Sequence, residues 1–189
     1  MANGRSYTIG RARRRDLAFI QPIELAAARL LEGYAPESVL AAATSEQHIA
    51  RAYSDRLLWV ARRDGCPVGF AHVVVHGNRA HLAELDVLPA HGRRGVGGRL
   101  VLTVCRWARS NRLKAVTLTT FRDVPWNMPF YAKLGFEEIP KAKLKDSLRR
   151  ILRAETRSGL DPARRVAMQL VIHASTRAAS AARYSRLVS

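Results

Sequence analysis

A basic, glycine-rich turn is the feature of this sequence best suited to chemistry. Residues 89–98 read Pro-Ala-His-Gly-Arg-Arg-Gly-Val-Gly-Gly, after an apolar strand pattern and before a helical one. The first turn of a helix leaves backbone N–H groups without intrahelical partners, at the positive end of the helix dipole. Arg93, Arg94 and Arg99 add positive charge, so we predict a diphosphate-binding site here. The residues expected to hold the phosphates are Arg93, Arg94, Gly95, Val96, Gly97 and Gly98.

Hydrophobic periodicity predicts the elements that position this turn. Strands are expected at residues 7–11, 57–62, 68–76, 80–88, 115–120, 136–139 and 165–173. Helices are expected at residues 16–31, 36–53, 97–110, 125–133 and 147–158. This order predicts a mixed α/β (α+β) fold with antiparallel hairpins, which excludes a purely parallel dinucleotide-binding sheet.

Single residues mark several ends of these elements. Asp16 is the expected N-cap of the first helix. Pro125 is the expected first residue of the fourth helix, and Gly135 its C-terminal cap. The pair Asp64-Gly65 predicts the turn of a hairpin between the second and third strands.

Length and composition bound the class of protein. The 189 residues suffice for one domain with a substantial core, predicted at residues 1–174 and followed by a mobile C-terminal tail at 175–189. No apolar run of the sequence reaches the roughly 20 residues that a membrane helix needs. The basic N-terminus lacks the apolar segment of a secretory signal, and two cysteines form no disulfide framework. We therefore expect a cytoplasmic protein with no membrane partner.

The strong positive charge raises the question of nucleic acid as a partner. The formal net charge is +17 at pH 7, and Lys and Arg side chains bind phosphates. The basic residues are spread along the whole chain, however, and a basic surface attracts any anionic ligand. Nucleic acid is therefore kept as the weaker alternative. His72 and His76 have no carboxylate pattern around them, so we expect no metal site.

Two segments of the chain resemble motifs of the GNAT superfamily, the acyl-CoA-dependent N-acetyltransferases. Residues 85–97, Leu-Asp-Val-Leu-Pro-Ala-His-Gly-Arg-Arg-Gly-Val-Gly, are similar to its pyrophosphate motif, although Gly92 stands where an Arg or Gln is usual. Residues 129–137, Pro-Phe-Tyr-Ala-Lys-Leu-Gly-Phe-Glu, are similar to its late helix and strand. The resemblance covers roughly residues 7–173. It implies a GNAT-like, mostly antiparallel sheet of six to seven strands flanked by helices.

The same resemblance implies acetyl-CoA as cosubstrate and no metal. It assigns the backbone of Leu85 and Val87 to the pantetheine arm, and the N–H of Val87 to the thioester carbonyl. Residues 93–98 would then hold the diphosphate. The side chains of Leu85 and Val87 also suit a place in the core. The two roles are compatible, because contact with the pantetheine arm uses only backbone atoms.

Acetyl transfer to an amine requires that the amine lose a proton and that the leaving thiolate gain one. Tyr131 is the candidate acid, because a phenol with a pKa of about 10 suits a thiol; aromatic packing is the alternative role for this side chain. His81, six residues before Val87, is the candidate base by its pKa, and Glu84 is the rival. A chain of waters without a dedicated base is also open.

These residues predict an N-acetyltransferase that moves the acetyl group of acetyl-CoA to a primary amine of a small molecule or a protein by direct attack. The alternatives are a non-catalytic, regulatory CoA-binding domain of the same fold and a basic nucleic-acid-binding protein. A homodimer is compatible with the sequence, and the acceptor stays open. Five acids between residues 24 and 55 could attract a cationic amine or form a solvated face: Glu24, Glu32, Glu37, Glu46 and Asp55.

Overall fold

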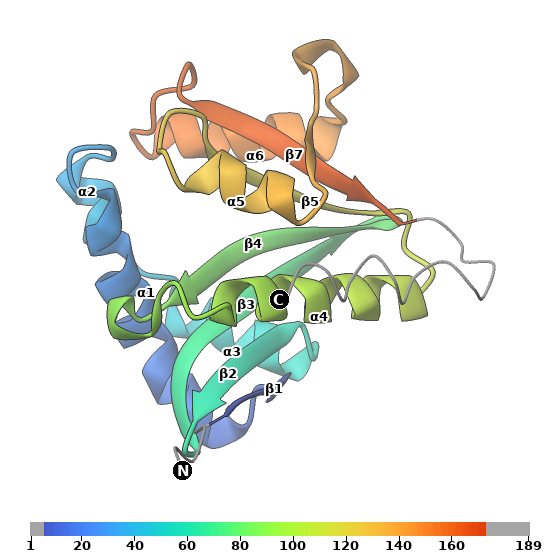
Figure 1. The fold of residues 1–189 in the computed structure, drawn as a ribbon. Coiled ribbons are helices and arrows are strands. Elements are labelled where there is room, and N and C mark those ends of the chain that lie inside the picture. The colour runs from blue at the N-terminus through green and yellow to red at the C-terminus, as the bar shows by residue number, and fades with distance from the viewer. Residues whose placement is uncertain (1–5, 173–189) are drawn as a thin grey trace. The chain divides into compact units, whose positions relative to one another are not determined.

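One sheet of seven strands runs through residues 6–172, the part of the chain that the computed structural model describes (Figure 1). Its order is β1-β2-β3-β4-β5-β7-β6. The neighbours β1/β2, β2/β3, β5/β7 and β6/β7 pair antiparallel, which confirms the predicted mixed, mostly antiparallel sheet. The strands are β1 (Tyr7–Arg11), β2 (Leu58–Arg63), β3 (Cys66–His76), β4 (Arg79–Val87), β5 (Ala115–Phe121), β6 (Glu137–Glu138) and β7 (Arg165–Val171).

Helices flank this sheet. The α-helices are α1 (Ile20–Ala28), α2 (Glu37–Leu40), α3 (Glu46–Ser54), α4 (Val96–Ser110), α5 (Asn127–Lys133) and α6 (Asp146–Arg157). Short 3₁₀ helices are η1 (Arg14–Phe19), η2 (Arg29–Leu31), η3 (Pro89–His91) and η4 (Lys141–Lys143). None of the helices within residues 6–172 has the length and apolar character needed to cross a bilayer.

The described residues divide into two units, which we treat separately. Unit 1 contains residues 6–74 and 82–104, and unit 2 contains residues 75–81 and 105–172. The strands β3 and β4 and the helix α4 contribute residues to both units. The tail predicted at 175–189 lies outside the described residues, as does His173 at the end of the last predicted strand.

The core of unit 1 lies between the strands β2 and β3 and the helices α1 and α3. One apolar cluster joins buried side chains of these four elements with Leu88, which follows β4. The buried members are Ile20, Ile23, Ile49, Ala52, Leu58, Val60 and Phe70. Successive side chains of a strand point to opposite faces, so the face of β4 that Leu88 continues is the one directed at α1.

A hairpin joins β2 to β3 as predicted. Asp64 and Gly65 both have positive φ, 52° and 82°, as a two-residue turn that follows the twist of its strands requires. The sequence also predicted the period of α4 correctly, because its expected apolar face is buried. That face consists of Leu100, Val101, Val104, Cys105 and Ala108.

Asp16 is not the N-cap that the sequence predicted. It is the third residue of η1, where its carboxylate accepts from the backbone N–H of Arg13 at 2.6 Å and forms a buried ion pair with Arg62 of β2. The two side chains are 1% and 4% exposed. A carboxylate removed from water needs such a partner, and the pairing with Arg62 draws Asp16 away from the cap of α1.

The helix predicted at residues 36–53 is two helices. α2 ends at Leu40, and α3 begins after Ser45, whose hydroxyl accepts from the N–H of His48 at 3.4 Å. Ser45 has an extended backbone and caps α3, and residues 42–45 between the two helices are not helical.

Unit 2 contains β5, β6 and β7 with α5 and α6. Leu148 and Ile151 of α6 pack against Ala167 of β7 and against Ile139. The helix α5 begins at Asn127, two residues later than predicted, and Pro125 lies in the preceding turn. Pro129 instead occupies the first turn of α5, where a missing N–H costs nothing.

Gly135 ends α5, as predicted. Its φ is +88°, and its N–H donates to the carbonyl of Ala132 at 2.9 Å. The N–H of Phe136 donates to the carbonyl of Tyr131 at 3.1 Å. These two bonds form a Schellman motif, in which the residue after the cap must adopt a left-handed conformation. The Leu-Gly-Phe of the late motif is therefore the stop signal of this helix.

Candidate functional site

The basic turn in unit 1 has the form that anion binding requires. η3 is followed by Gly92, Arg93 and Arg94, and α4 then begins at Val96. Gly95, with φ +73°, is the residue before the helix, and its carbonyl accepts from the N–H of Arg99 at 3.0 Å. Arg93 also has a positive φ, 55°. The first N–H groups of a 15-residue helix thus face outward behind two exposed arginines.

Strand β1 holds this turn in place. The hydroxyl of Tyr7 and Nδ1 of His91 are hydrogen bonded at 3.0 Å. The Arg99 guanidinium donates to the carbonyl oxygen of Tyr7 at 2.8 Å. Burial, with the nearby charges of Arg63 and Arg94, lowers the pKa of His91. The guanidinium of Arg99 is therefore engaged with β1, and Arg93 and Arg94 carry the exposed charge of the turn.

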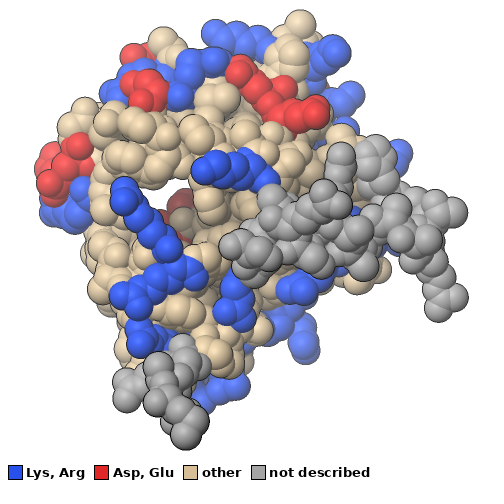
Figure 2. Space-filling model, in the orientation of Figure 1, with Lys and Arg blue, Asp and Glu red and all other residues tan. Residues whose placement is uncertain are grey.

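Figure 2 shows where charge gathers on one face of the molecule. Lys and Arg side chains are spread over this face, and a group of them lies where Figure 1 draws the turn before α4. The wide spread agrees with the distribution of basic residues in the sequence.

The backbone of β3 approaches the end of β4 unusually closely at Gly69. A Cβ placed on Gly69 of β3 would be 2.7 Å from the carbonyl oxygen of Asp86 and 3.2 Å from Cα of Val87. Only glycine permits this approach. Leu85 and Val87, the predicted ligands of the pantetheine arm, are partly exposed here. Gly69 therefore sets the position of the backbone that the resemblance assigns to the cosubstrate.

Two carboxyl groups of unit 1 were not singled out by the sequence as site residues. Glu24 of α1 accepts from the backbone N–H of Thr44 at 3.0 and 3.1 Å and from its hydroxyl at 2.9 Å. Gln21 donates to the Thr44 carbonyl at 2.9 Å. Burial raises the pKa of Glu24 against the effect of these bonds.

Asp86 of β4 is the second member of this pair. Its Oδ2 is buried and has no hydrogen-bond partner within residues 6–172. Burial, and next the charge of Glu24, raise the pKa of Asp86 to about 8. An acid inside the apolar run Leu85-Asp86-Val87-Leu88 was the sequence signal for this group, and Glu24 appeared only as one of five scattered acids.

The candidate base His81 lies in unit 2. It is 4% exposed, its Nδ1 is 3.2 Å from the hydroxyl of Thr117, and its ring lies 6.2 Å from that of His76. The Thr117 hydroxyl also donates to the carbonyl of Ala80 at 3.2 Å. A network of this kind holds an imidazole in one orientation. The rival, Glu84, belongs to unit 1 and is partly exposed.

Tyr131, the candidate acid, is a partly exposed residue of α5 in unit 2. Its ring meets those of Phe130 and Phe136 edge to face, with centroids 4.9 and 5.9 Å apart. The side chain thus has the aromatic packing that was its alternative role, and this packing fixes the direction of the ring.

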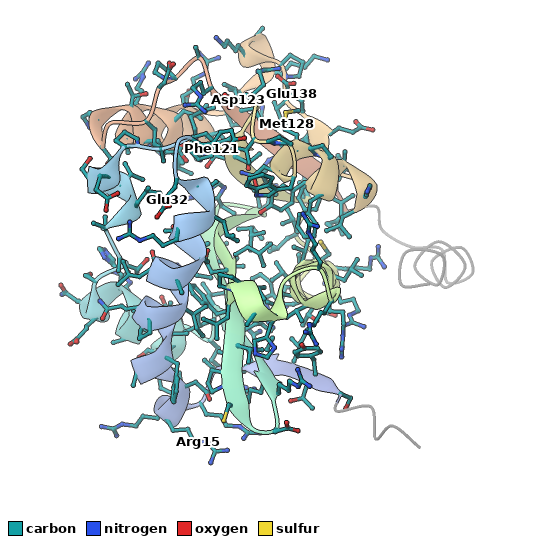
Figure 3. All side chains as sticks on the ribbon, turned by 60° about the vertical axis from the view of Figure 1, so that its left-hand side comes forward. Arg15, Glu32, Phe121, Asp123, Met128 and Glu138 are labelled. Carbon is teal, nitrogen blue, oxygen red and sulfur yellow. The ribbon has the colours of Figure 1, made fainter. Side chains whose placement is uncertain are left out.

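Charged pairs surround the end of β5 in unit 2 (Figure 3). Arg164 donates to Asp123 at 2.7 Å and lies 5.7 Å from the Phe121 ring. Arg122 pairs with Glu138 of β6 at 2.5 Å. Within the part of the chain that the structure describes, no three His, Cys, Asp or Glu side chains are grouped so that they could hold a metal ion.

Comparison with known proteins adds a family to this geometry. The model of the acetyltransferase (GNAT) family matches residues 25–136. The fold is similar to that of the ribosomal-protein-S18-alanine N-acetyltransferase from Escherichia coli, with a TM-score of 0.64 and 19% identity over 92% of this chain and 99% of that one.

Two further solved structures contain coenzyme A. The PaiA N-acetyltransferase from Thermoplasma acidophilum, in complex with coenzyme A, has a TM-score of 0.63 and 18% identity over 88% of this chain and 99% of that one. N-acetylglutamate synthase from Neisseria gonorrhoeae, complexed with coenzyme A and N-acetyl-glutamate, has a TM-score of 0.69 and 18% identity over 91% of this chain and 36% of that one. The family model matches more than half of the present chain, and the chain therefore belongs to the GNAT acetyltransferase family.

Proposed function

We propose that this protein transfers the acetyl group of acetyl-CoA to a primary amine of a small molecule or a protein, in the cytoplasm. The observation that carries the proposal is the turn between β4 and α4. It combines exposed arginines, a glycine with positive φ and the N-terminus of a long helix. Family membership supports acyl transfer in general, and the acceptor is taken up in the next subsection.

The residues of the turn fit a diphosphate. Gly97 and Gly98 lie in the first turn of α4 and have no side chain to obstruct a phosphate. Val96 packs its side chain inward and leaves its N–H at the start of the helix. Arg93 and Arg94 supply charge-assisted donors. These residues, with Gly95, would hold the phosphates of acetyl-CoA, which supplies an activated thioester when bound.

The remaining roles are proposed as the resemblance to the family assigns them. The N–H of Val87 polarises the thioester carbonyl. Stabilisation of the negative charge that develops on this oxygen is usually the largest single contribution to catalysis of acyl transfer. Tyr131 protonates the departing thiolate. His81 or Glu84 accepts the proton of the amine, or a water chain does so. Burial raises the pKa of Cys105 to about 12, which makes this thiol a poor nucleophile. The amine attacks the thioester directly.

The test measures binding and turnover on the same variants. Arg94→Glu should weaken acetyl-CoA binding in calorimetry about tenfold, because a charge-assisted bond to phosphate is replaced by repulsion. Arg153→Glu, the same change at an exposed position of α6, is the control for net charge. Wild-type protein should release thiol from acetyl-CoA when amines are added.

Each alternative function has its own outcome. Acetyl-CoA binding without thiol release across an amine panel would leave a regulatory CoA-binding domain. Salt-sensitive binding to DNA or RNA, without any shift in melting temperature on adding acetyl-CoA, would leave a nucleic-acid-binding protein. If Arg94→Glu and wild type bind acetyl-CoA with equal affinity, the turn is not part of the cosubstrate site.

A further inference from the structure

The carboxyl groups of Asp86 and Glu24 have no part in the roles proposed so far. We propose that they form the acceptor site: the pair binds the ammonium group of the acceptor, Asp86 takes its proton in place of His81, Glu84 or a water chain, and the site selects cationic amines that carry no carboxylate beside the amine. This inference rests on the proposed acetyl transfer and names its acceptor class and its base.

The fold of unit 1 directs both carboxyl groups toward the same layer. Asp86 and Leu88 lie two residues apart in extended backbone, so they share a face, and Leu88 packs against the cluster that contains Ile20 and Ile23 of α1. Glu24 is four residues after Ile20, which places it on the same side of α1. The electrostatic effect of Glu24 on Asp86 is the result of this arrangement.

Glu24 is the fixed member of the pair. The backbone N–H and the hydroxyl of Thr44 hold its carboxylate, and Gln21 holds Thr44 in turn. Bonds donated to a carboxylate favour its charged form. Burial raises the pKa of Glu24 in spite of these bonds, and the bonds fix the position of its carboxyl group, as electrostatic recognition of a cation requires.

Asp86 is the member that lacks a partner. Its Oδ2 is buried without a hydrogen bond to any residue of the described part of the chain, which costs free energy in proportion to its desolvation. An ammonium group supplies both the donors and the opposite charge that this oxygen lacks. A carboxylate beside the amine would bring a third acidic group to these two partly buried acids, and is therefore rejected.

The chemistry of the step balances. Asp86 acts in its ionised form, which predominates above its raised pKa of about 8; one proton then passes from the ammonium nitrogen to the Asp86 carboxylate and leaves a neutral amine. The lone pair of its nitrogen forms the bond to the acetyl carbon, the bond from that carbon to sulfur breaks, and the electron pair of this bond leaves with sulfur. The second proton of the nitrogen is lost as the amide forms, and the thiolate gains one proton. The products are an amide, a thiol and the proton on Asp86.

The experiment compares amines with their carboxylate-bearing counterparts. Tyramine is matched with tyrosine, and agmatine with arginine, so each pair differs by one carboxylate. Wild-type protein should acetylate the decarboxylated member with at least 30-fold higher kcat/KM. Asp86→Asn should lower kcat/KM for tyramine about 100-fold, as expected for loss of a general base. It should leave the affinity for acetyl-CoA unchanged within threefold.

Glu24→Gln and two controls separate recognition from proton transfer. Glu24→Gln should raise the KM for tyramine more than it lowers kcat. Glu32→Gln and Glu37→Gln remove exposed acids that pair with Arg29 in the same unit, and should change neither parameter more than twofold. Melting curves check that every variant is folded.

Binding of tyramine, measured by calorimetry with coenzyme A present, gives a second readout that does not require turnover. Tyramine binding that Asp86→Asn abolishes, without thiol release by wild type, would retain the acceptor site and refute acetyl transfer. Turnover by wild type with unchanged kcat/KM and tyramine binding in Asp86→Asn would overturn the acceptor site alone. A preference for tyrosine or arginine over the matched amine, or no binding of either amine, would overturn it as well.

Discussion

Tyr131 and Phe136 contact each other at the C-terminal end of α5 through both backbone and side chain. The N–H of Phe136 donates to the carbonyl of Tyr131 at 3.1 Å, and their rings meet edge to face with centroids 5.9 Å apart. The backbone bond and the ring contact belong to one helix-ending motif. The Tyr131 ring therefore has a structural role that does not involve its hydroxyl, and the two can be separated by mutation.

Tyr131→Phe keeps the ring and removes the hydroxyl. If the hydroxyl protonates the thiolate, kcat should fall about 100-fold, with the KM for acetyl-CoA unchanged. The melting temperature should stay within about 2 °C, because the packing is retained. Steady-state kinetics and thermal melts measure both. Tyr53→Phe in α3 is the matched control, and full activity of Tyr131→Phe would reduce this residue to packing.

Gly69→Ala tests the close approach of β3 to β4. The new Cβ would meet the carbonyl oxygen of Asp86 at 2.7 Å, and that atom belongs to the backbone and cannot turn aside. Overpacking of this kind costs about 2 kcal/mol, or a drop of about 4–8 °C in melting temperature. We expect acetyl-CoA affinity to fall as well, because Val87 must move.

Gly10→Ala is the control for this change. Gly10 is also a strand residue, but its added Cβ would lie 3.8 Å from the Arg62 side chain, an ordinary contact. Its melting temperature should match wild type within about 2 °C. If Gly69→Ala were equally harmless, the contact at β4 would not restrict the strand.

The features that the sequence predicted correctly depend on neighbours in the chain. Asp64 and Gly65 favour a turn with positive φ by their own chemistry, and the period of residues 97–110 reports the buried face of α4 directly. The cap at Gly135 likewise needs only the residues next to it. Such signals survive in any fold that contains these elements.

The features that the sequence missed depend on distant partners. Asp16 has the chemistry of an N-cap, but Arg62, 46 positions away, competes for its carboxylate. Nothing in a linear pattern shows that the charge of Glu24 in α1 acts on Asp86 in β4. A close approach such as that of Gly69 to Asp86 is also invisible until the strands are paired.

Asp16→Asn should destabilise unit 1 strongly. Arg62 would be left buried without its ion-pair partner, at a cost of about 3–5 kcal/mol. The double variant Asp16→Asn/Arg62→Met should recover part of this loss, since it leaves no unpaired charge. Denaturant unfolding of wild type, Asp16→Asn, Arg62→Met and the double variant gives the coupling energy of the pair, and additive losses would show that the pair does not act as a unit.

The same pair makes a prediction for acid. Burial opposes ionisation of Asp16, but the bonds from Arg62 and Arg13 outweigh it and lower its pKa. A lowered pKa contributes stability that is fully present above the unfolded value of about 4 and is lost as pH falls through the folded pKa. The difference in melting temperature between wild type and Asp16→Asn should therefore shrink below about pH 4.

Asp86 should act on stability in the opposite direction. Its pKa is raised to about 8 by burial and by Glu24, so the folded state holds a proton that the unfolded state has released above about pH 4. The stability associated with Asp86 is complete below that pH and declines as pH rises toward 8. Asp86→Asn cannot ionise and escapes this decline.

Because each pH unit between the two pKa values changes the free energy of unfolding by about 1.4 kcal/mol, the variant should gain on wild type by up to about 4 kcal/mol as pH rises from 5 to 8.5. Thermal melts of both proteins at several pH values measure the gap. Asp55→Asn, which removes a surface carboxylate near Arg51, controls for the loss of one negative charge. If the difference in melting temperature between wild type and Asp86→Asn does not change with pH, Asp86 has the same pKa in the folded and unfolded chain. Its Oδ2 would then need no cation to compensate for its burial.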